Sequence, residues 1–346
     1  MKRSFGKLND GREASLYTIT NGKGMTVCLT DLGATLVKVL VPDKDGKETD
    51  VILGYDTAQE YLDNGFYFGA VIGRNGNRID KARFTIDGKT YQLAVNDNEN
   101  NLHSGPDGFD SRIWEVKSCA ENAVVFALES PDGDEGFPGN MHAEVAYTVL
   151  DDNTLELCYT AESDADTVAN MTNHVYFNLG GHDSGSILDH ELKLATEYYT
   201  PVIDEQAIPT GEVASVKGTV MDFSAGRRIG QDIDADFDQL RYTGGYDHNF
   251  ALSAKAGEMK PMALARCKKT GIVMEGFTDC PGVQFYAGNF ITPHTGKGGA
   301  KYDKRFGFCL ESQYYPNAIN QEGFDSPLLK AGQTRRSVTR YRFSAE

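Results

Sequence analysis

Two side chains that can carry a proton stand beside apolar stretches of this sequence. His174 lies in Asn170–Gly181 (NMTNHVYFNLGG), just before Val175–Leu179, whose alternation predicts a strand with one buried face. An imidazole at a strand end can exchange a proton near neutral pH. Glu311 follows the apolar residues Phe308–Leu310 at the end of a predicted strand, and a carboxylate there is costly to bury and tends to have a raised pKa. From the residues alone, a hydrogen-bonded structural role is the stronger interpretation of His174, and an ordinary edge glutamate is as open an interpretation of Glu311 as a catalytic one.

The stretch around His174 resembles the central motif of the aldose 1-epimerase (galactose mutarotase) family. Five further stretches resemble that family in the same order along the chain: GAVIGRNGNRI at Gly69–Ile79, NNLHSG at Asn100–Gly105, YDHNF at Tyr246–Phe250, PGVQFYAGNF at Pro281–Phe290 and GFCLESQYYPNAIN at Gly307–Asn320. The matches run from about the first predicted strand to the last residues. They leave no part for a second domain, so we expect residues 1–346 to form a single domain.

The resemblance implies a reaction, mutarotation, which interconverts the α and β anomers of a free sugar. The O1 proton leaves, the ring oxygen O5 gains a proton, the ring opens, and the steps reverse. This chemistry needs one base and one acid, without a metal, a nucleotide or a covalent intermediate. The resemblance implies that Glu311 is the base at O1 and His174 the acid at O5. It assigns His103 to binding near the ring oxygen, and leaves open a share in the acid step.

The resemblance also implies residues that bind the sugar. Asp247 matches an acceptor of sugar hydroxyls, and one carboxylate can accept hydrogen bonds from two adjacent hydroxyls. Asn77 and Arg78 offer donors to sugar oxygens, and Arg78 can also hold a carboxylate. Gln284 can donate and accept. Tyr176 lies two residues from His174, hence on the same face of the predicted strand.

Other polar residues are expected to be structural. Arg74 is a weaker candidate for the site. The pair Asn75-Gly76 stands where small apolar residues are expected, and we expect it to loosen that loop while leaving the neighbouring Asn77 and Arg78 in place. The remaining histidines lack zinc-site spacing and are expected to be structural or solvated: His142, His182, His190, His248 and His294.

Three alternatives remain open. Asp247 and Glu311 could be the carboxylate pair of a glycosidase, although that chemistry needs no histidines. A sugar-binding protein without activity could share the fold, although it needs no acid–base pair. A mutarotase for hexose 6-phosphates would need a cationic cluster, and only Arg78 and Arg74 match near the site. The sequence does not resolve galactose from glucose or other aldoses.

The elements that must position these residues are mostly strands. Short alternating runs separated by Gly, Asn and Asp turns predict an all-β fold, a large antiparallel β-sandwich, and the resemblance implies the galactose mutarotase type. Asp87-Gly88 predicts a hairpin with a type I′ turn. Thr57–Asp63 predicts a short helix with Glu60 in a capping box. The stretches 131–139 and 203–245 are expected to be loops.

Composition sets limits on partners and compartment. The chain has 346 residues, 50 acidic against 34 basic, and a net charge of −16. Such a surface repels nucleic acid and anionic lipid, so neither is expected as a partner. The sequence shows no apolar signal segment, and the six scattered cysteines predict buried free thiols. We expect a soluble cytoplasmic protein without a cofactor, a monomer or weak homodimer, that binds a monosaccharide.

Overall fold

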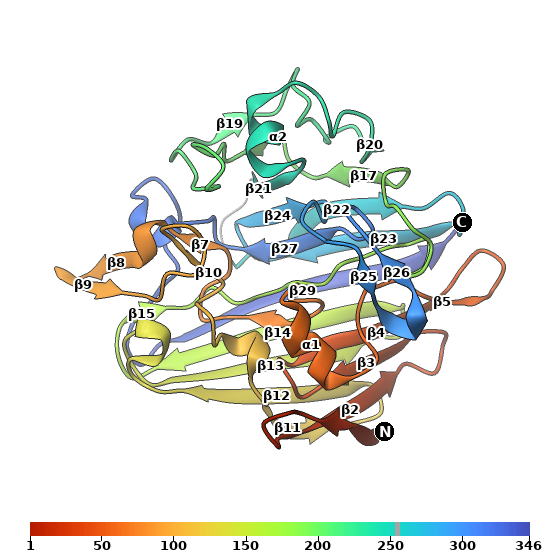
Figure 1. The fold of residues 1–346 in the computed structure, drawn as a ribbon, viewed down its shortest axis with the longest axis horizontal. Helices are drawn as coiled ribbons and strands as arrows, with labels where there is room; N and C mark the ends of the chain where they lie inside the picture. The colour runs from red at the N-terminus through yellow and green to blue at the C-terminus, as the bar shows by residue number, and fades with distance from the viewer. Residues whose placement is uncertain (253–256) are drawn as a thin grey trace.

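The largest element of the computed structural model, which describes residues 1–252 and 257–346, is a nine-stranded antiparallel sheet (Figure 1). Its strands in spatial order are β11 (Glu115–Cys119), β12 (Ala123–Ser130), β13 (Met141–Val149), β14 (Thr154–Ser163), β29 (Thr334–Ala345), β23 (Ile272–Thr278), β22 (Lys260–Arg266), β17 (Glu191–Leu194) and β20 (Arg227–Arg228). The last strand along the chain, β29, thus lies in the middle of the sheet, between β14 and β23.

Two five-stranded sheets form the second layer. One contains β1 (Lys2–Lys7), β2 (Glu13–Thr20), β3 (Thr26–Thr30), β4 (Thr35–Pro42) and β5 (Glu48–Asp50) in sequence order. The other has the order β19 (Ala214–Ser215), β18 (Tyr198–Tyr199), β21 (Asp247–Ala251), β24 (Gly282–Tyr286) and β27 (Cys309–Gln313). In Figure 1 the first of these sheets lies low in the view, and β21, β24 and β27 lie above it.

Short elements connect the layers. The paired strands are β6 (Val71–Ile72) with β16 (Thr172–Asn173), β7 (Arg78–Ile79) with β10 (Asn101–Leu102), β8 (Arg83–Ile86) with β9 (Lys89–Gln92), β15 (Thr167–Val168) with β28 (Leu328–Leu329), and β25 (His294–Thr295) with β26 (Lys301–Tyr302). The helices are α1 (Ala58–Asn64) and α2 (Asp238–Thr243).

The core lies between the layers because the central strands are apolar on one face only. Along β13, every second residue is buried, as period-two alternation requires. Ring contacts join the layers, for example Tyr17 of β2 against Phe126 of β12, with centroids 5.7 Å apart. The Tyr341 hydroxyl of β29 donates to the Leu310 carbonyl of β27 at 2.8 Å. The predicted antiparallel β-sandwich is confirmed.

Local signals in the sequence also gave the correct turns and cap. Asp87 and Gly88 have φ of 48° and 79°, as a type I′ turn requires at both central positions. At the start of α1, the Glu60 carboxylate accepts the Thr57 backbone N–H at 2.9 Å. Gly65 ends that helix in the left-handed region, with φ of 62°.

Three local predictions were wrong. Val175–Leu179 is not a strand, since it is buried on all sides and forms only isolated bridges through Phe177. It runs between residues 51–53 and 308 and hydrogen-bonds to both through its two edges, while its side chains are buried on both faces. Glu311 lies in the middle of β27, not at a strand end. The stretch 203–245 is not made of loops alone, because it contains α2. This helix has only six residues, so its sequence shows no clear helical pattern, although Leu240 on its apolar side is buried.

The described residues bear on two further expectations. All six cysteines are free thiols, as predicted, but Cys119 is exposed and Cys158 is only partly buried. In the part of the chain that the structure describes, no helix is long and apolar enough to cross a membrane.

Candidate active site

Three neighbouring strands, β21, β24 and β27, build one wall of the candidate site. In their register Asp247 pairs with Tyr286, and Gln284 pairs with Glu311. Because side chains alternate along a strand, these residues share one face of the sheet. The Gln284 amide donates to the Asp247 carboxylate at 2.7 Å. His248 lies on the opposite face and is fully buried, as expected from its place next to Asp247.

His174 follows directly after β16, and its backbone is fixed on both sides. Its N–H donates to the Ala70 carbonyl at 2.9 Å, and its carbonyl accepts the Gly69 N–H at 3.0 Å. Its side chain reaches the wall formed by β27: Nδ1 is 3.5 Å from Cys309 Sγ, and Nε2 is 3.7 Å from Glu311 Oε1. The predicted acid and base therefore lie side by side.

The third group of predicted residues comes from the paired strands β7 and β10. His103 follows β10, and its Nδ1 accepts the Asn77 backbone N–H at 3.1 Å. A neutral imidazole that accepts at Nδ1 carries its proton on Nε2. Arg78 Nε donates to Asp97 at 2.7 Å, which confirms that this arginine holds a carboxylate.

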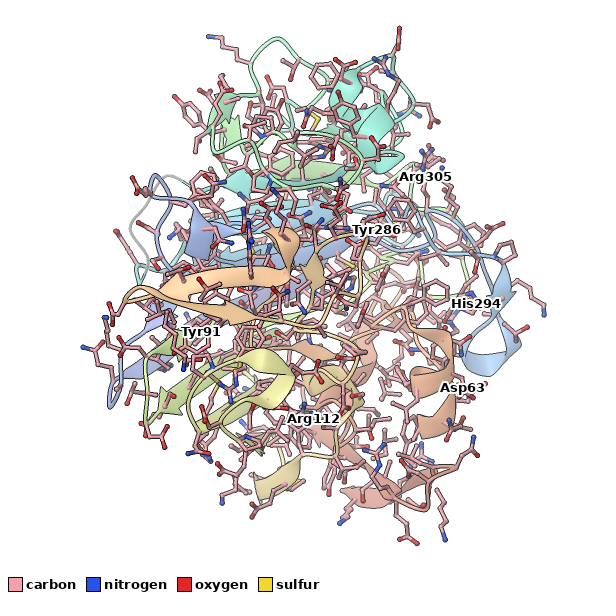
Figure 2. The ribbon with its side chains drawn as sticks, turned by 60° about the vertical axis from the view of Figure 1, so that its left-hand side comes forward. Asp63, Tyr91, Arg112, Tyr286, His294 and Arg305 are labelled. Carbon is pink, nitrogen blue, oxygen red and sulfur yellow. The ribbon has the colours of Figure 1, made fainter. Side chains whose placement is uncertain are left out.

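These residues surround one cavity of about 260 Å³. Its lining residues are Gly65, Phe66, Tyr67, Asn77, Arg78, Leu102, His103, His174, Tyr176, Asp247, Tyr286, Phe290 and Glu311. Of the predicted site residues only Gln284 is absent from the lining; it lies behind Asp247. Figure 2 shows Tyr286 in the middle of the molecule, with His294 and Asp63 toward one side. Pockets for drug-sized ligands usually measure about 300–1,000 Å³, so this cavity suits a smaller molecule.

Burial dominates the electrostatics of the two carboxylates. It raises the pKa of Glu311 well above its usual range, the nearby Asp247 charge adds to the effect, and Arg78 opposes it. Burial also raises the pKa of Asp247, while Arg78 and the hydrogen bond from Gln284 lower it. Glu311 is 2% exposed, and its Oε2 has no hydrogen-bond partner among the described residues. Such a carboxylate favours its protonated form and is a strong base when ionised.

Burial acts in the opposite direction on the histidines. It lowers the pKa of His174 to about 4. The pKa of His103 lies well below its usual value, because of burial first and then the neighbouring His174 and Arg78. Burial therefore favours the uncharged arrangement of the pair, protonated Glu311 beside neutral His174, over the ion pair.

A metal ion is a further possibility that the geometry raises. His103, His174 and Glu311 each offer one atom, and these atoms lie within 4.8 Å of one another. However, the Asn77 N–H holds the Nδ1 of His103, which leaves the proton on the Nε2 that a metal would need. A ligating histidine normally donates from its other nitrogen instead of accepting there. The donor set does not fit a metal.

Arg74 has a structural place. It is 1% exposed and lies outside the cavity lining. Its guanidinium donates to Ser130 Oγ at 2.9 Å and to the carbonyls of Pro138 and Gly139 at 2.8 and 2.9 Å. The arginine thus fastens the loop that precedes β13 to the segment that precedes Asn77.

The expected loosening at Asn75-Gly76 was wrong. The Asn75 N–H donates to Ser104 Oγ at 2.6 Å, and the Gly76 N–H donates to the Asn170 carbonyl at 2.7 Å. A Cβ on Gly76 would lie 2.8 Å from Thr172 Cγ2, so glycine allows a close approach of the two segments. The polar pair pins the loop to the segment before His174.

The five remaining histidines stay outside the cavity lining, in agreement with their expected structural roles. His142 bonds Glu129 and Glu144 at the surface, His182 bonds the Tyr302 hydroxyl, His190 accepts the Leu179 N–H, His248 is buried, and His294 bonds the Tyr55 hydroxyl.

Several lining residues were missed by the sequence analysis. Tyr67 and Phe66 come just before the motif that starts at Gly69, and an aromatic pair next to a recognised motif was a usable signal. Tyr286 lies two residues after Gln284, so strand alternation alone placed it on the same face. Phe290, 58% exposed in the loop after β24, ends the recognised motif Pro281–Phe290, and this position was a usable signal too.

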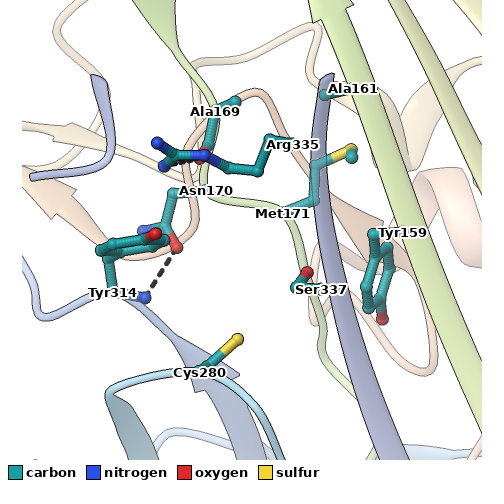
Figure 3. Close-up of a pocket in the computed structure, with 9 residues that line it drawn as sticks. All are labelled: Tyr159, Ala161, Ala169, Asn170, Met171, Cys280, Tyr314, Arg335 and Ser337. Atoms are coloured by element: carbon teal, nitrogen blue, oxygen red, sulfur yellow. Dashed lines mark hydrogen bonds between the residues drawn. The ribbon is translucent and has the colours of Figure 1, made fainter. Parts of the chain in front are cut away.

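A second, much smaller cavity lies elsewhere in the sandwich (Figure 3). It measures about 10 Å³, roughly the room of one water molecule. Its lining residues are Tyr159, Ala161, Ala169, Asn170, Met171, Cys280, Tyr314, Arg335 and Ser337. None of the predicted catalytic or binding residues is among them, and the space is too small for a sugar.

The fold and the cavity define a β-sandwich protein with a buried acid–base pair in a small polar cavity. The family profile of aldose 1-epimerase matches residues 15–342. A galactose mutarotase of Bos taurus is 43% identical over 92% of this chain and 91% of that protein. An aldose 1-epimerase of Escherichia coli (strain K12) is 40% identical over 97% of each. The chain belongs to the aldose 1-epimerase family.

Solved structures agree with this assignment. A galactose 1-epimerase from Lactobacillus acidophilus NCFM superposes with a TM-score of 0.86 at 28% identity, covering 100% of this chain and 98% of that one. A GalM/aldose epimerase homologue from C. elegans has the same TM-score of 0.86 at 30% identity, covering 96% of this chain and 99% of that one.

Proposed function

We propose that this protein interconverts the α and β anomers of free aldohexoses such as galactose and glucose. The observation that carries the proposal is the 3.7 Å separation of His174 Nε2 and Glu311 Oε1 in the cavity. O1 and O5 of a pyranose are bonded to the same carbon, C1. An acid and a base that act on these two oxygens must therefore lie close together, as this pair does.

In the proposed reaction, the Glu311 carboxylate takes the O1 proton as the electrons of that O–H bond form the C1 carbonyl. The C1–O5 bond breaks, and its electrons take a proton from the imidazolium of His174. Rotation about C1–C2 turns the aldehyde. As O5 attacks C1 and the ring closes, His174 takes back the proton of the O5 hydroxyl and Glu311 gives its proton to O1. Ring opening converts the ion pair into protonated Glu311 and neutral His174, which is the arrangement that burial favours.

The other predicted residues hold the sugar. Asp247 accepts from hydroxyls and is oriented by Gln284, while Arg78, oriented by Asp97, donates. The proton on Nε2 of His103 makes this residue a fixed donor, because Nδ1 is already engaged. Asn77 and Tyr176 complete the polar lining.

The cavity favours an unphosphorylated sugar. Among its lining residues, which all belong to the described part of the chain, Arg78 is the single lysine or arginine, and Asp97 already pairs with it. A phosphate of charge near −2 would need more cationic donors.

Two features support wider parts of the proposal. One main core cluster draws on both layers, from Tyr17 to Phe343, which supports a single domain. The free thiols support a cytoplasmic location. A monomer or weak homodimer stays a prediction, which sedimentation would test.

Optical rotation tests the function. Crystalline α-galactose and α-glucose are dissolved with and without protein, and the spontaneous rate is subtracted. We expect acceleration for at least one sugar. A parallel incubation with a disaccharide, assayed for new reducing ends, separates this activity from a glycosidase. Absence of acceleration for both sugars would refute the proposal.

A further inference from the structure

Tyr67, which precedes β6, contacts both histidines of the cavity at once. Its ring centroid is 4.9 Å from that of His103, at 69° between the planes, and 5.6 Å from that of His174, at 34°. The two imidazoles are themselves 5.2 Å apart and nearly perpendicular, at 86°. The three rings thus form a closed group in which each contacts the other two.

The backbone that carries Tyr67 is also tied to His174. Tyr67 has φ of 58°, an uncommon value for a tyrosine, and its carbonyl accepts the Ala70 N–H at 3.1 Å. Ala70 and Gly69 are the residues that exchange hydrogen bonds with the His174 backbone. The tight turn therefore links the tyrosine to the histidine through both backbone and ring.

Tyr67 also lines a third cavity. It measures about 150 Å³ and shares Gly65 and Tyr67 with the active-site cavity. It contains Asp110, whose pKa burial raises to about 7, and the proximity of Asp110 adds to burial in raising the pKa of Tyr67 to about 12. Tyr67 is thus a wall between a reaction cavity and a separate polar space.

Resting on the proposed function, we propose that Tyr67 is a positioning residue: its ring holds His103 and His174 at their mutual angle and separates them from the neighbouring cavity. Between ring opening and closing, Glu311 keeps a proton that must return to the sugar. A ring that keeps this neighbouring cavity apart limits the water that reaches the pair during that interval.

Two substitutions separate the ring from its hydroxyl. Tyr67→Phe keeps the ring contacts and should keep kcat within about twofold. Tyr67→Leu keeps an apolar side chain but removes the planar wall. A misplacement of about 1 Å can cost about 10²-fold, so we expect kcat to fall by about 10–100-fold, with a smaller change in KM.

The pH profile provides a readout that loss of stability alone would not move. The titratable groups that face His174 are His103, Glu311, Cys309, Tyr67, Tyr176 and Tyr286. Opening the wall admits water, which weakens the burial that lowers the pKa of His174. In Tyr67→Leu the acid limb of kcat/KM should therefore move to higher pH, while Tyr67→Phe should keep the parent limb.

Phe66→Leu is the matched control, because Phe66 lines the same cavity but stacks on Phe68 and His294. It should leave the acid limb unmoved. Thermal melts establish that each variant is folded, and NMR titration of the His174 ring reports the same shift without turnover. A folded Tyr67→Leu with parent kcat and an unmoved limb would overturn the inference, as would equal losses in Tyr67→Phe. An inactive parent would refute the proposed function instead, while the NMR comparison would still test the wall.

Discussion

Replacing Glu311 by glutamine tests the proposed base directly. The amide keeps the size of the side chain, which is buried opposite Gln284 on the next strand, so the fold has room for it. It has no lone pair of suitable basicity to accept the O1 proton. Asp247 is a poor substitute, since its carboxylate is held by Gln284 at 2.7 Å and lies two strands away from β27.

The expected loss follows from these contacts. General base catalysis contributes about 10²–10⁴ in rate, or about 3–5 kcal/mol of barrier. Because burial raises the pKa of Glu311, its ionised form is a stronger base than an exposed glutamate, which favours the middle to upper part of this range. We expect Glu311→Gln to lower kcat about 10³-fold while sugar binding changes only a few-fold. His174→Asn should behave similarly, and the two losses should combine less than additively, since both groups act in one ring-opening step.

The assay is polarimetry of freshly dissolved α-galactose, with binding measured separately by calorimetry. Asp247→Asn is the control, because it removes another buried carboxylate from the same cavity and should raise KM more than it lowers kcat. A Glu311→Gln protein that is folded, binds sugar and turns over near the parent rate would refute the reasoning. The base would then have to be His103 or Asp247.

Three further predictions follow from the same cavity. A plot of kcat/KM against pH should be bell-shaped. The value should fall below about pH 4, where both His174 and Glu311 are protonated, and at high pH, where both have lost their protons. A flat profile between pH 3 and 10 would contradict this prediction. Asp247→Ala and Arg78→Ala should each weaken galactose binding by about 1.5–3 kcal/mol in calorimetry, and parent affinity would disprove the assignment. Folding raises the pKa of Glu311, so the contribution of this residue to the stability of the folded protein is fully present below about pH 4.5 and is lost as pH rises through the folded-state pKa. Glu311→Gln should therefore melt at a higher temperature than the parent, by a margin that grows from pH 5 to 8. A constant margin would exclude this cause.

The sequence was most informative where the pattern was local. The alternation in β13 and β14 and the turn at Asp87-Gly88 are encoded by neighbouring residues, and the structure has them as predicted. The segment Val175–Leu179 failed because its partners, residues 51–53 and 308, are far away in sequence. Those partners hydrogen-bond to its two edges, and no local pattern reports that both of its faces are buried.

The candidate site was likewise predictable only in part. Motif resemblance brought His103, His174 and Glu311 together, but could not give the tautomer of His103, which depends on the backbone of Asn77. It also could not give the direction of the pKa shifts. The limbs of the pH profile, which the family roles would assign to ionised Glu311 on the acid side and protonated His174 on the basic side, are exchanged once burial is known.

The position of β29 between β14 and β23 has a consequence for biosynthesis. Until residues 334–345 leave the ribosome, both of those strands present unpaired edges, which are ready templates for aggregation. About 170 residues separate β14 from β29, and at about 5–20 residues per second their translation takes roughly 10–30 s. Until then the nascent chain has an open sheet between those two strands. Chaperones that shield those edges during this interval should govern the yield of native protein in the cell.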